Sequence, residues 1–373
     1  MEAKYKRIKN LIKSDILSGL TVPHQKISSE NELMRQFNVS RHTVRLAIGE
    51  LVSEGWLYRE QGAGTFCADR TNLKDAEVVD EHSEKNIAIV TTFISEYIFP
   101  SIIRGAEAYL SEQGYRVSIF NTNNQYQIER EILDKILLNN YAGVIIEPAN
   151  SSAPNPNLKY YLNLEREKIP YVMINAVYDE LEPVSFMMDD IKGGYMQTKH
   201  LIELGHKDIV CIYKTDDSQG RKRLKGFIKA HRESNLTLNP QNIITYTSGN
   251  EMTEPVRCLS KLLDNKYNKP TAVVCYNDQL VMRVMDYIRK KGLCIPEDLS
   301  IVGYDDSILA EVSEVKLTSV IHPKQTLGWD AAKAVTCMIK KKSMKDKKLS
   351  CLYEPELNIR QSTLQLSEKL LLS

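Results

Sequence analysis

Short apolar runs alternate with amphipathic stretches through most of residues 86–306. The runs are rich in β-branched residues, which is typical of strands buried in a parallel sheet. The expected strands lie in NIAIVTTFI, YRVSIFNT, GVIIEP, PYVMINA, DIVCIYK, IITYT, AVVCYND and LSIVGYDD. The expected helices cover residues 100–113, 128–138, a stretch before 170, 193–204, 220–232, 255–264 and 279–290. The series is interrupted near residues 175–205, so the pattern predicts an α/β body of two lobes, each a parallel sheet with helices on both faces.

Residues 1–68 follow a different pattern. Apolar residues at helical spacing predict a first helix over 4–18. Ser29 and Glu32 form a capping box that predicts the start of a second helix, and Ser40 is placed to cap a third. The second and third helices are expected over 30–37 and 41–54. The residues expected to be buried are Ile8, Leu11, Ile12, Ile16, Leu33, Met34, Phe37, Val44, Ile48, Leu51 and Val52.

A short hairpin is predicted after the third helix. Its strands are expected on either side of a glycine-rich turn at 60–64. Three helices followed by such a hairpin make an α+β winged helix-turn-helix, which inserts the start of its third helix into a DNA major groove. We therefore expect a DNA-binding head over 1–68, a flexible polar linker over 69–85 and a ligand-binding and dimerisation body over 86–373.

Polar residues at the start of the third helix lie off its apolar stripe. Arginine pairs bidentately with guanine, and histidine or threonine can reach a base or a phosphate. Gln61 and Gly62 at the hairpin tip are placed to approach the minor groove. A solvated helix face and a plain flexible hairpin are the alternative interpretations. The candidate DNA contacts are Glu30, Ser40, Arg41, His42, Thr43, Arg45, Gln61 and Gly62.

Charge and cysteine usage narrow the class of protein. Net charge is +3 over residues 1–70 and −2 over the rest, so a mildly basic head joins a nearly neutral body. The 7 cysteines are widely spaced, with no zinc-type spacing, which favours reduced thiols in the cytoplasm. The N-terminal sequence MEAKYKRIKN has no apolar segment of a signal peptide, and no apolar run is long enough to span a membrane. We expect no metal, cofactor, catalytic residue or membrane partner.

Polar and aromatic side chains follow the expected strands of the body. The carboxyl ends of parallel strands meet at one edge, where ligands of such sheets bind. Carboxylates, amides and arginine hydrogen-bond to hydroxyl groups, and aromatic faces pack against the C–H surface of a sugar. The candidates are Phe93, Tyr97, Phe99, Glu147, Asn175, Arg223, Asn277, Asp278 and Asp305. Two of these candidates have structural alternatives: Asp278 could cap a helix, and Phe99 could lie in the core. Asp306 and Arg221 also follow this pattern, with a helix cap and a solvated side chain as their alternatives.

Two family resemblances refine these expectations. The segment SENELMRQFNVSRHTVRLAIGELVSEGWLYREQGAGTF resembles the winged-helix head of the GntR family of bacterial repressors. In that family, the arginines of the recognition helix and the glycine-rich wing contact operator DNA. The resemblance carries this role to Glu30, Arg41, His42, Thr43, Arg45, Gln61 and Gly62.

The body, from about 86 to 362, resembles the effector domain of the LacI/GalR regulators, which are relatives of periplasmic sugar-binding proteins. The resemblance is carried by IAIVTTFISEYIFPSIIRGAEAYLSEQGY, RLKGF, CYND, PEDLSIVGYDD and LTSVIHPKQTLGWDAA. It implies a two-lobed, periplasmic-binding-protein-like fold. It also implies ligand contacts at positions matching Phe93, Asn175, Arg223, Tyr246, Asn277, Asp305 and His322.

The fusion of these two parts resembles the arabinose-responsive repressors of Bacillus-type bacteria. The resemblance implies a homodimer that binds double-stranded operator DNA of pentose-utilisation genes and is released by L-arabinose. The residues alone indicate only a small polyhydroxy ligand. An activator of the same architecture, or a response to another sugar, stays open. A sugar-active enzyme and a transport binding protein are the disfavoured alternatives, because catalytic motifs and a signal peptide are both missing from the pattern.

Overall fold

The computed structural model describes residues 4–17, 19–69, 85–94, 97–139, 141–265, 269–340 and 349–366. Most of the predicted linker, residues 70–84, lies outside the described residues. The chain divides into two units. Unit 1 is Met1–Lys85, Arg130–Ala142 and Asn157–Ile169, and unit 2 is Asn86–Glu129, Gly143–Pro156 and Pro170–Ser373.

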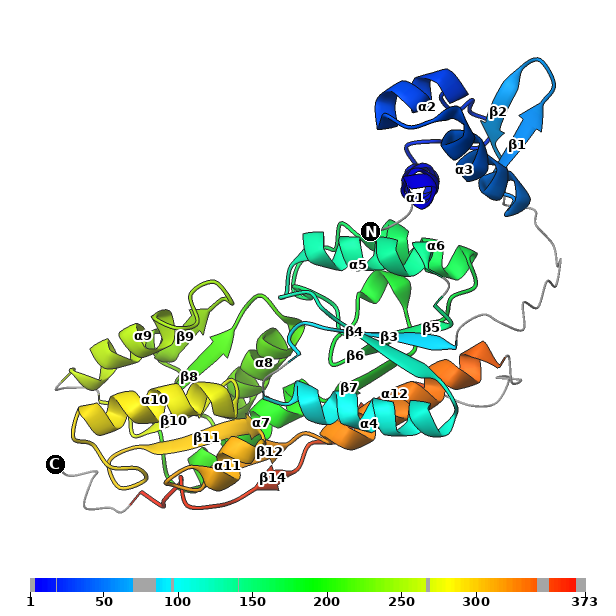
Figure 1. Cartoon of the computed structure of the whole chain (residues 1–373). Coiled ribbons are helices and arrows are strands. Elements are labelled where there is room, and N and C mark those ends of the chain that lie inside the picture. The colour runs from blue at the N-terminus through cyan, green and yellow to red at the C-terminus, as the bar shows by residue number, and fades with distance from the viewer. Residues whose placement is uncertain are drawn as a thin grey trace. The chain divides into compact units, whose positions relative to one another are not determined.

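The N-terminal part of unit 1 is the predicted winged helix-turn-helix (Figure 1). Its elements are α1 (Lys4–Leu17), α2 (Glu30–Phe37), α3 (Arg41–Ser53), β1 (Leu57–Glu60) and β2 (Gly64–Cys67). The capping box is confirmed: Ser29 accepts from the Glu32 amide, and the Glu32 side chain accepts from the Ser29 amide. Asn38 ends α2 in the left-handed conformation, and Ser40 caps α3 by accepting from the Thr43 amide.

The buried face of the head differs from the expected one. Leu11 is 41% exposed, so its predicted burial is wrong, while Leu17 is buried. Lys13 is also buried, because its ammonium group lies over the Trp56 ring, 4.7 Å from the centroid. The buried face of α1 therefore includes Lys13 and Leu17 and excludes Leu11. The spacing of apolar residues could not predict this, because the lysine is not an apolar residue. Ile16, Met34, Phe37 and Val52 are only half-buried.

Unit 2 contains two six-stranded sheets in the part of the chain that the structure describes. The first has the order β13-β7-β6-β5-β3-β4 and is parallel throughout; the second has the order β14-β12-β11-β10-β8-β9, with only β14 antiparallel. The first comprises β3 (Asn86–Thr91), β4 (Arg116–Asn121), β5 (Gly143–Ile146), β6 (Tyr171–Ile174), β7 (Ser185–Met188) and β13 (Cys351–Tyr353). The second comprises β8 (Ile209–Lys214), β9 (Ile243–Tyr246), β10 (Ala272–Cys275), β11 (Ser300–Asp305), β12 (Thr318–Ile321) and β14 (Leu357–Asn358). The predicted α/β body is therefore confirmed.

Helices cover both faces of the second sheet. Side chains alternate along β8: Val210 and Ile212 join the core under α9 and α10, whereas Cys211 and Tyr213 pack toward α7 and α8. The helices of unit 2 are α4 (Phe99–Glu112), α7 (Asp190–Glu203), α8 (Ser218–Glu233), α9 (Glu254–Leu263), α10 (Asp278–Lys290), α11 (Ile308–Val312) and α12 (Lys324–Ile339). Helices α5 (Tyr126–Leu138) and α6 (Leu158–Arg166) fall mainly in unit 1.

Among the described strands and helices, the chain crosses between the two sheets three times. It passes from β7 into α7, from β12 into α12, and from β13 into β14, and α12 packs with α4 against the first sheet. We call the first sheet with α4 and α12 lobe 1, and the second sheet with α7–α11 lobe 2. The sequence pattern indicated one interruption near 175–205; the two later crossings, and the strands β7, β12, β13 and β14 and helix α12, were missed because they are short or lie after the recognisable alternation.

Two helix pairs in unit 2 cross at unusually close range. A Cβ at Gly105 of α4 would lie 2.1 Å from the Gln325 carbonyl oxygen of α12. In the other pair, a Cβ at Gly226 of α8 would lie 2.2 Å from the Ile191 carbonyl oxygen of α7. Both distances are shorter than van der Waals contact, so only glycine permits these crossings.

Gly226→Ala should therefore lower the free energy of unfolding by about 1–3 kcal/mol or more, because overpacking at a backbone contact forces the helices apart. Gly249→Ala is the matched control, since its Cβ would meet only the Thr247 Oγ1 at an ordinary 3.8 Å. Chemical denaturation of both variants measures the difference. Equal stability of the two variants would contradict the close crossing.

Candidate functional site

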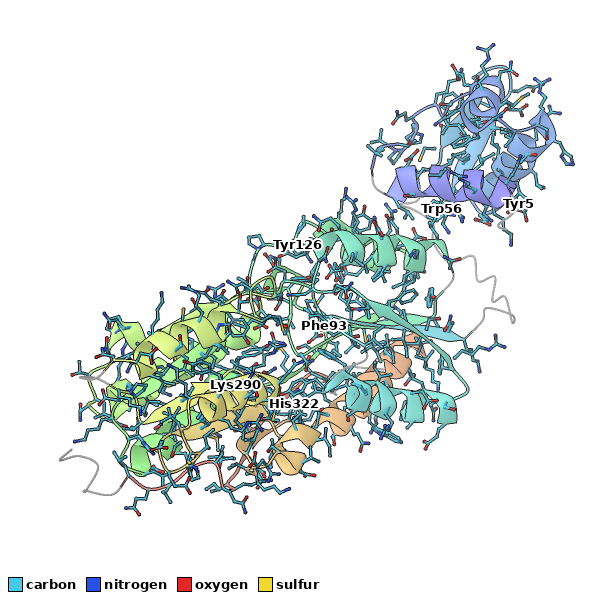
Figure 2. The ribbon with its side chains drawn as sticks, turned by 60° about the vertical axis from the view of Figure 1, so that its left-hand side comes forward. Tyr5, Trp56, Phe93, Tyr126, Lys290 and His322 are labelled. Carbon is cyan, nitrogen blue, oxygen red and sulfur yellow. The ribbon has the colours of Figure 1, made fainter. Side chains whose placement is uncertain are left out.

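A cavity of about 400 Å³ lies within unit 2, between the strand ends of lobe 1 and lobe 2. Its size falls in the range of small-molecule sites. Figure 2 labels two of its lining residues, Phe93 after β3 and His322 in the β12–α12 crossing. The sequence-predicted residues that line it are Phe93, Tyr97, Phe99, Glu147, Asn175, Arg223, Tyr246, Asn277, Asp305 and His322.

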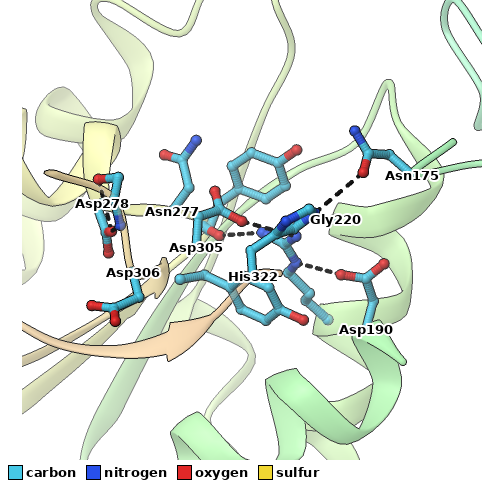
Figure 3. A network of polar contacts seen from close by, with 12 residues as sticks. Asn175, Asp190, Gly220, Asn277, Asp278, Asp305, Asp306 and His322 are labelled. Carbon is cyan, nitrogen blue, oxygen red and sulfur yellow. Dashed lines mark hydrogen bonds and ion pairs between the residues drawn. The ribbon is translucent and has the colours of Figure 1, made fainter. Parts of the chain in front are cut away.

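Arg223 is the central charged group of the cavity wall, and Figure 3 labels its two ion-pair partners, Asp190 and Asp305. Its side chain is 5% exposed, and its Nε donates to Asp190 Oδ1 at 2.8 Å. Its Nη1 donates to the Tyr276 carbonyl oxygen at 2.6 Å, and the guanidinium carbon lies 3.4 Å from the Tyr304 ring centroid. Burial raises the pKa of Asp190, and the neighbouring Arg223 offsets part of that rise. The guanidinium is thus held in one orientation by groups from three elements.

A chain of hydrogen bonds links Glu147, Asn175 and His322. Glu147 accepts from the Thr92 amide and hydroxyl and, at 2.9 Å, from Asn175 Nδ2. The Asn175 Oδ1 lies 3.2 Å from His322 Nε2, so this imidazole nitrogen is the donor. The other nitrogen, Nδ1, is buried and has no hydrogen-bond partner among the described residues, so it can accept a bond from a ligand hydroxyl. Burial lowers the pKa of His322 to about 4 and keeps it neutral near pH 7.

Tyr97 joins the two lobes at the cavity wall. Its hydroxyl donates to Asp305 Oδ2 at 2.6 Å and accepts from the Asp278 amide at 3.1 Å. Tyr97, Asn175 and Asp305 all have positive φ angles, of 68°, 62° and 91°. Such backbone is unfavourable for residues other than glycine and gathers at functional sites. All three residues carry polar side chains that line the cavity.

Asp278 and Asp306 occupy places that differ from the expected ones. The structure does not place Asp278 in the cavity lining; its carboxylate accepts from the Ser307 amide and the Ser319 hydroxyl, and burial raises its pKa to about 7. Asn277, not Asp278, caps α10, so the capping alternative for Asp278 is wrong. Asp306 is not a helix cap either: it pairs with Arg360 at 2.6 Å.

Several charged lining residues were missed from the sequence. They are Asp190, Lys214, Asp217, Glu251 and Arg283. Lys214 ends β8 and Asp217 caps α8, so the strand-end rule that found the other candidates would have found them. Arg283 comes from the middle of α10 and enters the lining only through tertiary packing, which no local pattern reveals.

The predicted DNA-facing residues gather at the start of α3. Arg41 Nε lies 3.3 Å from one Glu30 oxygen, and Arg45 Nε lies 3.2 Å from the other. Both arginine side chains are well exposed, at 60% and 64%. Ser40 is used as the N-cap; His42 is exposed and Thr43 half-exposed beside the arginines, whereas Gln61 and Gly62 lie at the hairpin turn. A single carboxylate therefore orients two cations on one exposed helix start.

The described residues contain no cluster of histidine, cysteine or acidic side chains suited to a metal ion. Among the same residues, every helix is too short or too polar to cross a bilayer.

Replacing Arg223 by methionine should lower the free energy of unfolding by about 3–5 kcal/mol, because it leaves the buried Asp190 carboxylate without its partner. Arg232→Met is the matched control: this arginine is exposed on the same helix, and its loss should change stability by less than about 0.5 kcal/mol. Urea denaturation compares them. Similar stabilities for the two variants would contradict the role given to Arg223.

The stability contribution of His322 should depend on pH. Its folded-state pKa of about 4 lies below the usual value of 6.5, so between these values only the unfolded chain takes up the proton. Native stability is therefore lost as pH falls from about 6.5 to about 4. The difference in unfolding free energy between the native protein and His322→Gln should shrink by about 2–3 kcal/mol from pH 7 to pH 4. A difference that does not vary with pH, in denaturation series at each pH, would refute this.

Comparison with known proteins supports the assignment of both the head and the body. Residues 4–67 match the model of bacterial regulatory proteins of the gntR family, and residues 198–363 match the periplasmic binding protein-like domain. The LacI family transcriptional regulator from Enterococcus faecium, solved with bound ribose, superposes with a TM-score of 0.64 at 24% identity and covers 76% of this chain and 100% of its own, which supports the fold.

Two relatives match nearly the whole chain. The arabinose metabolism transcriptional repressor of Halalkalibacterium halodurans is 56% identical over 97% of both chains. The repressor of the same name from Geobacillus stearothermophilus is 46% identical over 96% of this chain and 97% of its own. These proteins are transcriptional regulators and not enzymes. The chain therefore belongs to the family of arabinose metabolism transcriptional repressors, in which a GntR-type head is joined to a periplasmic-binding-protein-like domain.

Proposed function

We propose that this protein represses arabinose and pentose utilisation genes by binding their operators as a homodimer, and that L-arabinose releases it. The observation that carries the proposal is the paired presentation of Arg41 and Arg45 by Glu30 on the exposed start of α3. The domains proposed for these tasks are 1–68 for DNA, 69–85 as a linker and 86–373 for effector binding and dimerisation.

The geometry of the head supports direct reading of bases. Exposed ion pairs in water contribute little to stability, so holding Arg41 and Arg45 with Glu30 is better explained by orientation. A guanidinium held in this way can exchange its carboxylate for the bidentate acceptor edge of guanine. Gln61 and Gly62, at the tip of the hairpin, are then proposed to approach the adjacent groove.

The chemistry of the cavity supports a neutral sugar. Arg223, Asn175 and the Nδ1 of His322, which has no partner among the described residues, offer donors and acceptors to hydroxyl groups. Phe93 and Phe99 lie with their ring centroids 6.1 Å apart and supply apolar surface for C–H groups. L-Arabinose is proposed because the two relatives that match almost the whole chain are named as arabinose metabolism repressors.

Release of DNA requires that sugar and operator prefer different states of the dimer. In the proposed mechanism, sugar binding shifts the two lobes further toward the closed state that the free protein already populates, alters the packing of one body on the other and changes the spacing of the heads. The two heads can then no longer bind both half-sites of a near-palindromic operator at the same time. By linkage, operator DNA must weaken sugar binding by the same factor, typically about 5–150-fold.

The proposal predicts that DNA from upstream of neighbouring pentose genes binds tightly at stated salt and is released by L-arabinose but not by D-xylose, D-ribose or D-galactose. Fluorescence anisotropy with labelled DNA measures this. If another sugar releases the DNA, that sugar is the effector and the repressor mechanism still holds. If the protein shows no sequence-selective binding, the operator assignment is refuted.

Arg45→Ala should weaken operator binding by about 1–3 kcal/mol and relax base preference, because it removes one base-reading cation. Arg232→Ala, which removes an exposed arginine of the body, should leave operator binding unchanged. The same titration, run with matched and mutated operators, compares the variants. Unchanged affinity and selectivity in Arg45→Ala would contradict the orientation given to α3.

A further inference from the structure

Direct hydrogen bonds join the two lobes at the rim of the cavity. The loop after β5, in lobe 1, meets the start of α8, in lobe 2. The Ser218 amide donates to Ser151 Oγ at 3.0 Å, and Arg221 Nη1 donates to the Ser152 carbonyl oxygen at 2.8 Å. The first amides of a helix lack acceptors within the helix, so the serine of the opposite lobe satisfies one of them.

A third contact lies beside these two. Asn124, at a φ of 56°, accepts from the Asn150 amide through Oδ1 and donates from Nδ2 to the Ser248 Oγ at 3.1 Å. The Ser248 amide in turn donates to Asp216 Oδ2 at 2.8 Å, which holds the lobe 2 side in place. On the lobe 1 side, the Tyr126 hydroxyl donates to the Asn150 carbonyl oxygen at 2.8 Å. Each partner of the contact is thus fixed by its own lobe.

We propose that these contacts, Asn124–Ser248, Ser151–Ser218 and Ser152–Arg221, form a clasp that holds the lobes closed and slows departure of the ligand. Asn124 and Ser151 also line the cavity, so the clasp lies directly on its edge. The naming of the ligand as L-arabinose rests on the proposed function; the clasp itself does not depend on that identity. Arg221 acts in it as a positioning residue.

The chemistry of the clasp suits a reversible closure. Its partners are only partly buried or, for Arg221, exposed, so water replaces each bond when the lobes separate. Two of the contacts use backbone atoms, the Ser218 amide and the Ser152 carbonyl, so the clasp forms whichever ligand occupies the cavity. The clasp therefore affects the dissociation rate of the ligand, whereas the residues of the cavity wall determine which ligand binds.

The test uses the full chain with Arg221→Ala and Ser248→Ala combined, two side chains outside the cavity lining. Stopped-flow measurement of L-arabinose should show a dissociation rate raised by about 5–20-fold, with a similar association rate, since each bond lost weakens the closed state modestly. Arg232→Ala, on the exposed far end of the same helix, should keep the native rate. A native dissociation rate in the double variant overturns the clasp.

Hydrogen exchange separates this outcome from a wrong effector. Without sugar, peptides covering residues 148–155 and 214–222 should exchange several-fold faster in the double variant than in the native protein or in Arg232→Ala. If the native chain does not bind L-arabinose, the proposed function fails for that sugar, while faster exchange in these two peptides still supports the clasp. Unchanged exchange there overturns it.

Discussion

The buried guanidinium of Arg223 is the interaction on which the body depends. A charge at this depth is tolerated only with a close counter-ion and further hydrogen-bond acceptors, and here these are Asp190 of α7 and the Tyr276 carbonyl after β10. The aromatic ring of Tyr304 covers one face of the group. These three contacts link helices α7 and α8 to strands β10 and β11. They also place the guanidinium, a hydrogen-bond donor, at the cavity wall. The backbone of Arg223 also packs closely against α7: its carbonyl oxygen lies 2.2 Å from the point where a Cβ on Gly194 would be. The residue that buries the charge therefore also lies at the close crossing of α7 and α8.

The segments that cross between the lobes place other residues of the cavity lining near Arg223. His322 lies in the crossing from β12 to α12 and bonds to Asn175 after β6, which joins elements of both lobes. Two residues later, Lys324 Nζ donates to the carbonyl oxygens of Asp305 and Asp306 at 2.6 and 2.9 Å. Both aspartates have positive φ angles, so the lysine stabilises backbone that would otherwise be unfavourable.

The cavity wall and its rim have different physical characters. The polar centre of the wall consists of the buried side chains of Asn175, Arg223, Asp305 and His322. Such groups discriminate between ligands because leaving one of them without a partner is costly. The rim is built from half-exposed serine and asparagine side chains whose bonds water can replace at little cost. A regulator needs both properties, because selectivity for one sugar and prompt response to its removal are set by different contacts.

Local pattern alone determined the order of elements in the head and most of those in the body. The capping box at Ser29 and Glu32, the cap at Ser40 and the apolar runs of β3, β8 and β10 are read from neighbours in the chain, where helix and strand periodicities act. Resemblance to known families added His322 and Tyr246 as cavity residues, which no local signal identified. The burial of Lys13, the support of Arg223 by Asp190, the removal of Asp278 from the cavity and the entry of Arg283 into it were decided only by tertiary structure. Each depends on a partner far away in sequence, and periodicity records which face of an element is apolar but not which distant charge, ring or glycine that face will meet.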